Sequence, residues 1–139
     1  MTRFVLDASV ALAWFIDSPI PSYAAGVKNF LLGGARAVVP ALWHLEMANG
    51  FAVARRRGIL TSADANRGMT RLDQLLSQVI ESAVDFVPMR QAYNTVVAFQ
   101  LSAYDAVYFD MARREGLPLA TLDRRLLAAA RQAGIISLA

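Results

Sequence analysis

Short apolar segments alternate along this chain with longer segments in which apolar residues recur at helical spacing. The short segments show no clean alternation of apolar and polar residues, which is typical of strands buried on both faces of a parallel sheet. We expect strands at Arg3–Leu6, Ala37–Val39, Phe86–Val87, Leu119–Leu122 and Ile135–Leu138. Because these strands alternate with helices, the pattern predicts an α/β fold with a parallel sheet of about five strands flanked by helices.

The longer segments carry recognisable helix signals. Thr61 is the expected N-cap of a helix that runs to about Ser82, and the apolar residues of its second half share one face. Gly33 and Gly34 form a stop signal for the helix before them. The expected helices are Ala8–Phe15, Ser22–Leu32, Pro40 to near Gly58, Thr61–Ser82, Arg90–Gln100, Ala103–Glu115 and Arg124–Ala133.

Length and composition limit what the chain can be. Its 139 residues fit a single domain spanning 1–139, and a hydrophobic fraction of 56% permits a sizeable core. No apolar run approaches the roughly 18 residues needed to cross a bilayer. Asp7 interrupts the first apolar stretch, which therefore does not look like a secretory signal. The absence of Cys excludes disulfides and thiolate metal sites. We expect a protein without a membrane segment, located in the cytoplasm.

Charge gives a weaker indication. The net charge of +3 is carried almost wholly by Arg, with Lys28 as the single Lys. Arg suits planar phosphate contacts but is also common in Arg-rich proteomes. Charge alone therefore neither supports nor excludes a role in nucleic-acid binding. The high apolar fraction suggests surface that a partner or a second copy covers. Candidates for this surface are Trp14, Phe15 and Phe30, with Phe51 as a weaker candidate. Any one of them taken singly is better explained as ordinary core.

Asp7 and Asp123 each follow a short apolar strand and precede a helix. Either one alone is best explained as a helix N-cap. Ligands of parallel α/β sheets, however, bind at the carboxyl ends of the strands. Two acids in the same position after two strands therefore predict one shared acidic site.

Two further acids have positions that suit such a site. Glu46 lies on a largely apolar or small helical stripe, and Asn49 follows it by one turn, where its amide could orient the carboxylate. Asp105 lies in the first turn of a helix, where the macrodipole alone would also favour an acid. Asp110, about 140° further round that helix, is predicted to face solvent. His44, the single His, has no identifiable catalytic partners.

Clustered carboxylates need a compensating cation. Two carboxylates about 4 Å apart repel by about 4 kcal/mol at an effective dielectric near 20. A site of hard oxygen ligands without Cys or His favours Mg²⁺ or Mn²⁺. Such ions activate water and offset the charge of a phosphodiester in the transition state. An all-carboxylate site therefore indicates phosphoryl chemistry more than peptide or ester hydrolysis.

Four sequence blocks contain these acids and are distributed in order over nearly the whole chain: Phe4–Val10, Pro40–Asn49, Tyr104–Tyr108 and Leu119–Leu126. In order and spacing they resemble the PIN domain, specifically the VapC-type ribonuclease toxins of bacterial and archaeal toxin–antitoxin modules. Any one block is a weak signal, whereas four in order are a specific one. The resemblance implies a single PIN-like domain, a sheet ordered 3-2-1-4-5 and activity as the endoribonuclease toxin of a toxin–antitoxin pair.

The resemblance also implies roles for individual residues. Catalysis falls to Asp7, Glu46, Asp105 and Asp123 around Mg²⁺, with Mn²⁺ as a substitute. Asp7, Asp105 and Asp123 are the expected metal ligands, and Ser9, Asn49 and Thr121 are the expected supporting polar groups. RNA is the implied substrate, and a cognate antitoxin and a second copy of the chain are the implied protein partners. Some PIN domains carry another acid just after the fourth, but Arg124 and Arg125 stand there in this chain, so one dominant metal site is expected.

Other functional classes fit less well. A phosphoacceptor domain needs an Asp after the third strand and a late Lys, whereas Asp85 precedes the expected strand and Lys28 comes early. A dinucleotide-binding domain needs a Gly-rich turn after the first strand, and none is present. The remaining alternative is an RNA- or protein-binding α/β module with an inert acidic groove, which metal-dependent cleavage of RNA would distinguish from a nuclease.

Overall fold

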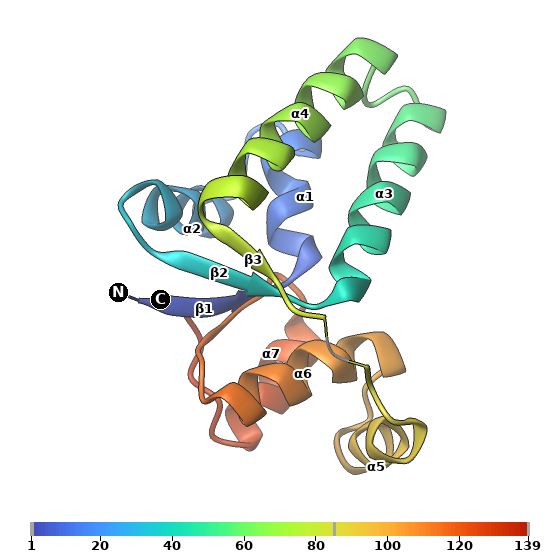
Figure 1. Cartoon of the computed structure of the whole chain (residues 1–139). Helices are drawn as coiled ribbons and strands as arrows, with labels where there is room; N and C mark the ends of the chain where they lie inside the picture. Colours follow the sequence, from blue (N-terminus) through green and yellow to red (C-terminus); the bar gives the residue numbers. More distant parts are fainter. Residues whose placement is uncertain (1, 85, 139) are drawn as a thin grey trace.

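The fold is a parallel sheet between two layers of helices. A computed structural model describes residues 2–84 and 86–138, so Asp85 lies outside the described residues. Within these ranges the sheet has four parallel strands in the order β3-β2-β1-β4 (Figure 1). The strands are β1 (Arg3–Leu6), β2 (Arg36–Val39), β3 (Ile80–Ser82) and β4 (Leu119–Ala120).

The expected fifth strand is present only as a short extension beyond β4. Ser137 forms a single parallel bridge with Leu119. Leu119 N donates to Ile136 O at 2.9 Å, and Leu138 N donates to Leu119 O at 2.9 Å. The predicted α/β class and the order 3-2-1-4-5 are therefore confirmed, with a bridge in place of a full last strand.

The third strand lies earlier in the chain than predicted. Ile80–Ser82 pairs with β2, whereas Phe86 and Val87, the predicted strand, lie outside the sheet, and the Phe86 side chain is 85% exposed. The helix predicted to run to Ser82 ends at Gln78. The β-branched residues Val79 and Ile80 continue the apolar spacing of the helix, but they suit a strand better. Pairing with β2 therefore takes precedence over the helical pattern.

Helices cover both faces of the sheet. Figure 1 shows α1 to α4 on one side and α6 and α7 on the other, with α5 packed against α6. Thr61 caps α4 as predicted: its hydroxyl accepts from Asp64 N at 3.0 Å. The helices are α1 (Ala8–Ile16), α2 (Ser22–Leu32), α3 (Ala41–Arg56), α4 (Ser62–Gln78), α5 (Met89–Phe99), α6 (Ala103–Glu115) and α7 (Arg124–Gln132). None of the described helices is long and apolar enough to cross a membrane.

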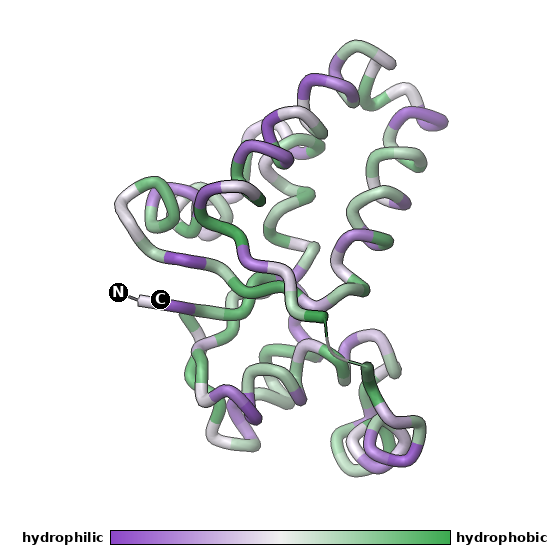
Figure 2. The backbone as a smooth tube through the Cα atoms, viewed as in Figure 1, coloured by the Kyte–Doolittle hydropathy of each residue, from purple (hydrophilic) through white to green (hydrophobic). Residues whose placement is uncertain are grey.

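The core lies along β1 and its neighbours, and Figure 2 shows apolar residues gathered at the centre of the sheet. Trp14 and Phe51 belong to this core, which was the favoured interpretation of each residue taken singly, and they do not contribute to a partner surface. Phe15 is partly buried, and Phe30 is the exposed member of the four candidates. Burial follows from the close packing of α1 on its neighbouring helices, which the sequence spacing alone does not show.

The side chain of Leu12 on α1 lies against Gly50 on α3. A Cβ built at position 50 would lie 2.5 Å from a methyl carbon of Leu12. Real Cβ atoms essentially never approach other atoms so closely, so a side chain at this position would require the Leu12 side chain to move. Glycine at position 50 thus leaves room for Leu12 where the two helices pack.

Candidate active site

Strands β1 and β4 bring the two strand-end acids to the same edge of the sheet. Val5 pairs with Leu119 and Leu6 pairs with Ala120. Asp7 N then donates to Ala120 O at 3.0 Å, so the chain leaves both strands side by side. Asp7 follows β1 directly and Asp123 follows β4 after a short turn. The strand adjacency predicted from the resemblance is confirmed.

Two hydroxyl groups hold the buried carboxylate of Asp7. Its Oδ2 atom accepts from Ser9 Oγ at 2.6 Å and from Thr121 Oγ1 at 2.7 Å. Ser9 Oγ in turn accepts from Leu122 N at 3.0 Å, which links the two strand ends again. Asp7 makes no side-chain capping bond to α1. The simple N-cap explanation therefore does not account for Asp7, and the structure places Ser9 and Thr121 where supporting groups were expected.

Asp123, in contrast, does cap a helix. Its Oδ1 atom accepts from Arg125 N at 2.9 Å and from Leu126 N at 3.1 Å at the start of α7. Its own N–H donates to Thr121 Oγ1 at 2.9 Å. Thr121 therefore contacts both strand-end acids, and the cap fixes the Asp123 carboxylate at the same edge.

Glu46 is held by a residue to which the sequence assigned no role. The Tyr108 hydroxyl on α6 donates to Glu46 Oε1 on α3 at 2.6 Å. Asn49, the expected orienting group, is exposed, and within the described ranges its side chain does not hydrogen-bond to Glu46. The sequence offered one indication that Tyr108 lies near the site: it belongs to the third sequence block and follows Asp105 by one helical turn.

Asp105 is half-buried in the first turn of α6, where its backbone N–H donates to the capping hydroxyl of Ser102 at 3.1 Å. The carboxylate is thus presented by a helix terminus.

His44 is exposed on α3, with Nε2 2.7 Å from Ser82 Oγ. The imidazole is thus directed to Ser82.

The electrostatics of the four acids are linked. Burial raises the pKa of Asp7. The hydrogen bonds from Ser9 and Thr121 offset part of this increase, and the negative charge of Asp123 adds to it. Burial also raises the pKa of Asp105, as do the charges of Asp123 and Asp7. Burial raises the pKa of Glu46, the Tyr108 bond lowers it, and the charges of Asp7 and Asp105 raise it. Each of these carboxyls therefore senses at least one of the others.

The donor chemistry of this edge suits a hard divalent cation, because the donors are carboxylates, the chain has no Cys and His44 points elsewhere. Within residues 2–84 and 86–138, the four acids form no ion pair with a basic side chain. The same residues include no set of three acidic, His or Cys side chains arranged to enclose a metal ion. The donor chemistry of this edge thus fits a hard cation.

Asp123→Asn is expected to stabilise the protein in EDTA by about 1 kcal/mol after solvent screening. The amide can still accept the two bonds that cap α7, while the charge that raises the pKa of Asp7 and Asp105 is removed. Asp123→Ala also removes the cap and should instead cost about 0.5–2 kcal/mol. Thermal melting in EDTA and in excess Mg²⁺ measures both effects.

Mg²⁺ should raise the melting temperature of wild type more than that of Asp123→Asn, since binding stabilises only the state that holds the ion. If Asp123→Asn melts below wild type in EDTA and gains as much from Mg²⁺, Asp123 is not part of a charged metal cluster.

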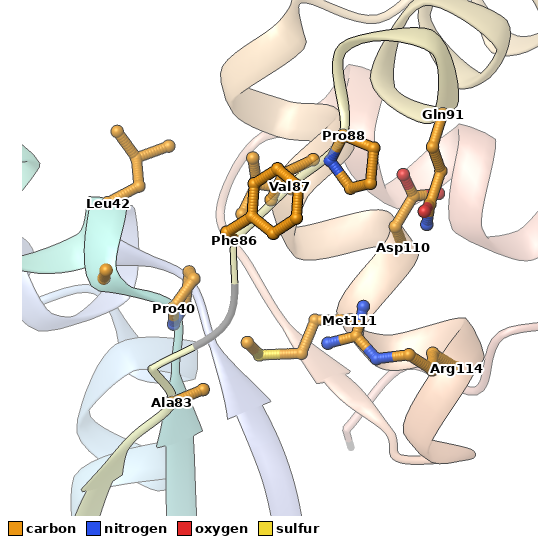
Figure 3. A pocket seen from close by; sticks show the side chains of 12 residues that line it. Pro40, Leu42, Ala83, Phe86, Val87, Pro88, Gln91, Asp110, Met111 and Arg114 are labelled. Carbon is orange, nitrogen blue, oxygen red and sulfur yellow. The ribbon is translucent and has the colours of Figure 1, made fainter.

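Asp110, predicted to face solvent, is instead 5% exposed, so that prediction is wrong. Helix α5 covers this side of α6, and Thr95 Oγ1 donates to Asp110 Oδ1 at 2.8 Å. Arg113 Nη2 lies 3.5 Å from the same oxygen. Asp110 lines a pocket of about 210 Å³, where Figure 3 shows Pro88 and Gln91 beside it. The four candidate acids are not among the described residues that line this pocket, which is separate from the acidic edge.

The parallel sheet, its two helical layers and the acids beyond β1 and β4 define an α/β domain with an acidic edge. The model of the PIN domain matches residues 4–132. The chain belongs to the PIN domain family, as the sequence resemblance predicted.

Proteins similar to this chain in sequence include VapC ribonucleases. The chain is 31% identical over 124 residues to VapC ribonuclease Mb0985 of Mycobacterium bovis and to ribonuclease VapC9 of Mycobacterium tuberculosis, covering 88% of this chain and 87% of each relative. The crystal structure of PAE2754 from Pyrobaculum aerophilum aligns with a TM-score of 0.71 at 25% identity, covering 98% of this chain and 83% of that one. VapBC2 from Rickettsia felis, bound to a DNA fragment from its promoter, aligns with a TM-score of 0.64 at 13% identity, covering 99% and 98%. The last similarity shows the shared fold.

Proposed function

We propose that the protein is a Mg²⁺-dependent endoribonuclease and acts in the cytoplasm as the toxin of a toxin–antitoxin pair. The observation that carries this proposal is the buried carboxylate of Asp7, which caps no helix and lies within the electrostatic reach of Asp123, Asp105 and Glu46. Burying and gathering acids is costly without a compensating charge. The VapC ribonuclease relatives support the choice of RNA.

In this proposal Asp7, Asp105 and Asp123 hold the cation, Mg²⁺ or Mn²⁺. When bound, the ion supplies an activated water and offsets the charge of the phosphodiester. The protein supplies orientation: Ser9 and Thr121 hold one oxygen of Asp7. Asn49, exposed on α3 near Glu46, remains a candidate for a water or RNA contact.

The remaining residues have distinct tasks. Asp105 is presented by the first turn of α6, and the cap of α7 fixes Asp123. Glu46, with a pKa raised by burial and by its acidic neighbours, is proposed to hold the cation directly or through a water, or to take a proton from the attacking water. Arg124 and Arg125 are exposed directly after Asp123, where they can contact RNA phosphates.

Protein partners are proposed on a surface that does not include the buried Trp14 and Phe51. Apolar side chains stand exposed on the segment before α5, on α5 itself and at the start of α6, and a partner protein is expected to cover such surface. We assign this surface to the cognate antitoxin, in line with the structural similarity to VapBC2, and a second copy of the chain is proposed as a further partner. Its members are Val84, Phe86, Met89, Tyr93, Val97 and Tyr104.

One experiment separates a nuclease from a binding module with an inert acidic groove. Purified protein is incubated with a pool of labelled RNA in Mg²⁺, and both binding and fragment formation are measured. We expect new RNA ends in Mg²⁺, and we expect the cognate antitoxin to suppress them. RNA that is bound but remains intact at every Mg²⁺ and Mn²⁺ concentration would favour the binding module.

A further inference from the structure

Core packing accounts for the buried ring of Tyr108 but not for the place of its hydroxyl group. The side chain is fully buried on α6, and its hydroxyl donates to Glu46 Oε1 at 2.6 Å. One hydroxyl thus connects α6 and α3, the two helices that present Asp105 and Glu46.

We propose that Tyr108 is a positioning residue that fixes the Glu46 carboxylate for the cleavage reaction. This inference rests on the proposed function. A Glu side chain has several rotatable bonds and loses much of their freedom when its position is fixed. The buried aromatic ring of Tyr108 has far fewer alternatives, and its bond occupies Oε1. Glu46 Oε2 accepts no hydrogen bond from the described residues and remains available to a cation or a water.

A purely structural role would predict a different outcome. In that case the bond would only tie α6 to α3, and its loss would lower stability without affecting the acids. Thr95 provides a matched control, because its hydroxyl also donates to a buried carboxylate on α6, that of Asp110, at 2.8 Å. Tyr108→Phe and Thr95→Val each remove one such hydroxyl and keep most of the side-chain shape.

The two variants are compared with wild type in RNA cleavage and in the Mn²⁺ concentration that half-saturates the rise in melting temperature without RNA. Loss of a group that orients a metal ligand or its partner typically costs about 10- to 100-fold in metal affinity or activity. We expect Tyr108→Phe to lower kcat by that factor, to leave KM for RNA within about threefold, and to raise the half-saturating Mn²⁺ concentration about tenfold. Thr95→Val should lower the melting temperature but change neither kcat nor the Mn²⁺ response.

A double-mutant cycle tests whether Tyr108 acts through Glu46. In a Glu46→Ala background, Tyr108→Phe should change kcat and the Mn²⁺ response by less than about twofold. The proposal is overturned if Tyr108→Phe matches wild type in both measurements, or if its effect is undiminished in the Glu46→Ala background. A Tyr108→Phe protein without a cooperative melting transition also counts against it, since the hydroxyl would then be needed for the fold itself.

Failure of the proposed function gives a different result. If wild type does not cleave RNA, the nuclease assignment fails, while the Mn²⁺ dependence of melting still tests the positioning role. If the melting of wild type does not respond to Mn²⁺ either, both proposals are rejected.

Discussion

Asp7→Asn should reduce RNA cleavage by on the order of 10³-fold or more, at or beyond the upper end of what loss of one electrostatic stabiliser costs. The amide oxygen can still accept from Ser9 and Thr121, so the network around position 7 keeps its shape. What is lost is the negative charge that the cation requires. Asp105→Asn should have an effect of similar size, because Asp105 is half-buried and senses the charges of Asp7 and Asp123. Growth inhibition should disappear together with cleavage.

Asp110→Asn is the matched control for both variants. Asp110 is also a buried acid that accepts a hydroxyl bond, but it lies on the side of α6 that faces α5. We expect this variant to retain cleavage within a few-fold of wild type at temperatures where it is folded. Rates are measured on labelled RNA in Mg²⁺ with folding verified by circular dichroism. Full activity of purified Asp7→Asn or Asp105→Asn under these conditions would refute the assignment of the site.

Removal of divalent cations with EDTA should stop cleavage completely, and Mg²⁺ or Mn²⁺ should restore it. The physical reason is that acids sharing one buried edge cannot approach an anionic phosphodiester without a compensating charge. Zn²⁺ is a poorer match, because the site lacks Cys and His44 is directed to Ser82. Cleavage that continues at the same rate in excess EDTA would exclude a cation at this site.

A single dominant metal site is expected in the absence of RNA. Arg124 and Arg125 follow Asp123 where another acid could complete a second site, and both are exposed. Calorimetric titration with Mn²⁺ should therefore give a stoichiometry near one, with a second ion binding only when RNA supplies a phosphate. Two equally tight sites in the free protein would contradict this expectation. Asp7→Asn serves as the control, because it should abolish the heat of the dominant site.

The sequence was sufficient for those features that depend on local order along the chain. The apolar runs located β1, β2 and β4, and the position of an acid directly after β1 and another after β4 predicted that both lie at one sheet edge. The third strand was missed because Val79 and Ile80 continue the helical spacing of α4. Only pairing with β2 distinguishes the two possibilities, and that contact is distant in the sequence.

The features that sequence reasoning missed at the site are tertiary contacts. The bond from Tyr108 to Glu46 joins residues on different helices, and no periodicity marks either as the partner of the other. Asp110 appeared to face solvent because the covering helix α5 is invisible in the pattern of α6 alone. A helical repeat shows which residues share a face, but it does not show what packs against that face.

The contact between Leu12 and Gly50 has a consequence for variation at position 50. Glu46 lies one turn before Gly50 on α3, and Asp7 directly precedes α1, so the two helices that meet at this contact also present two of the candidate acids. Any larger residue at position 50 requires the Leu12 side chain to adopt another conformation. A comparison of the acidic residues alone would not record such a change.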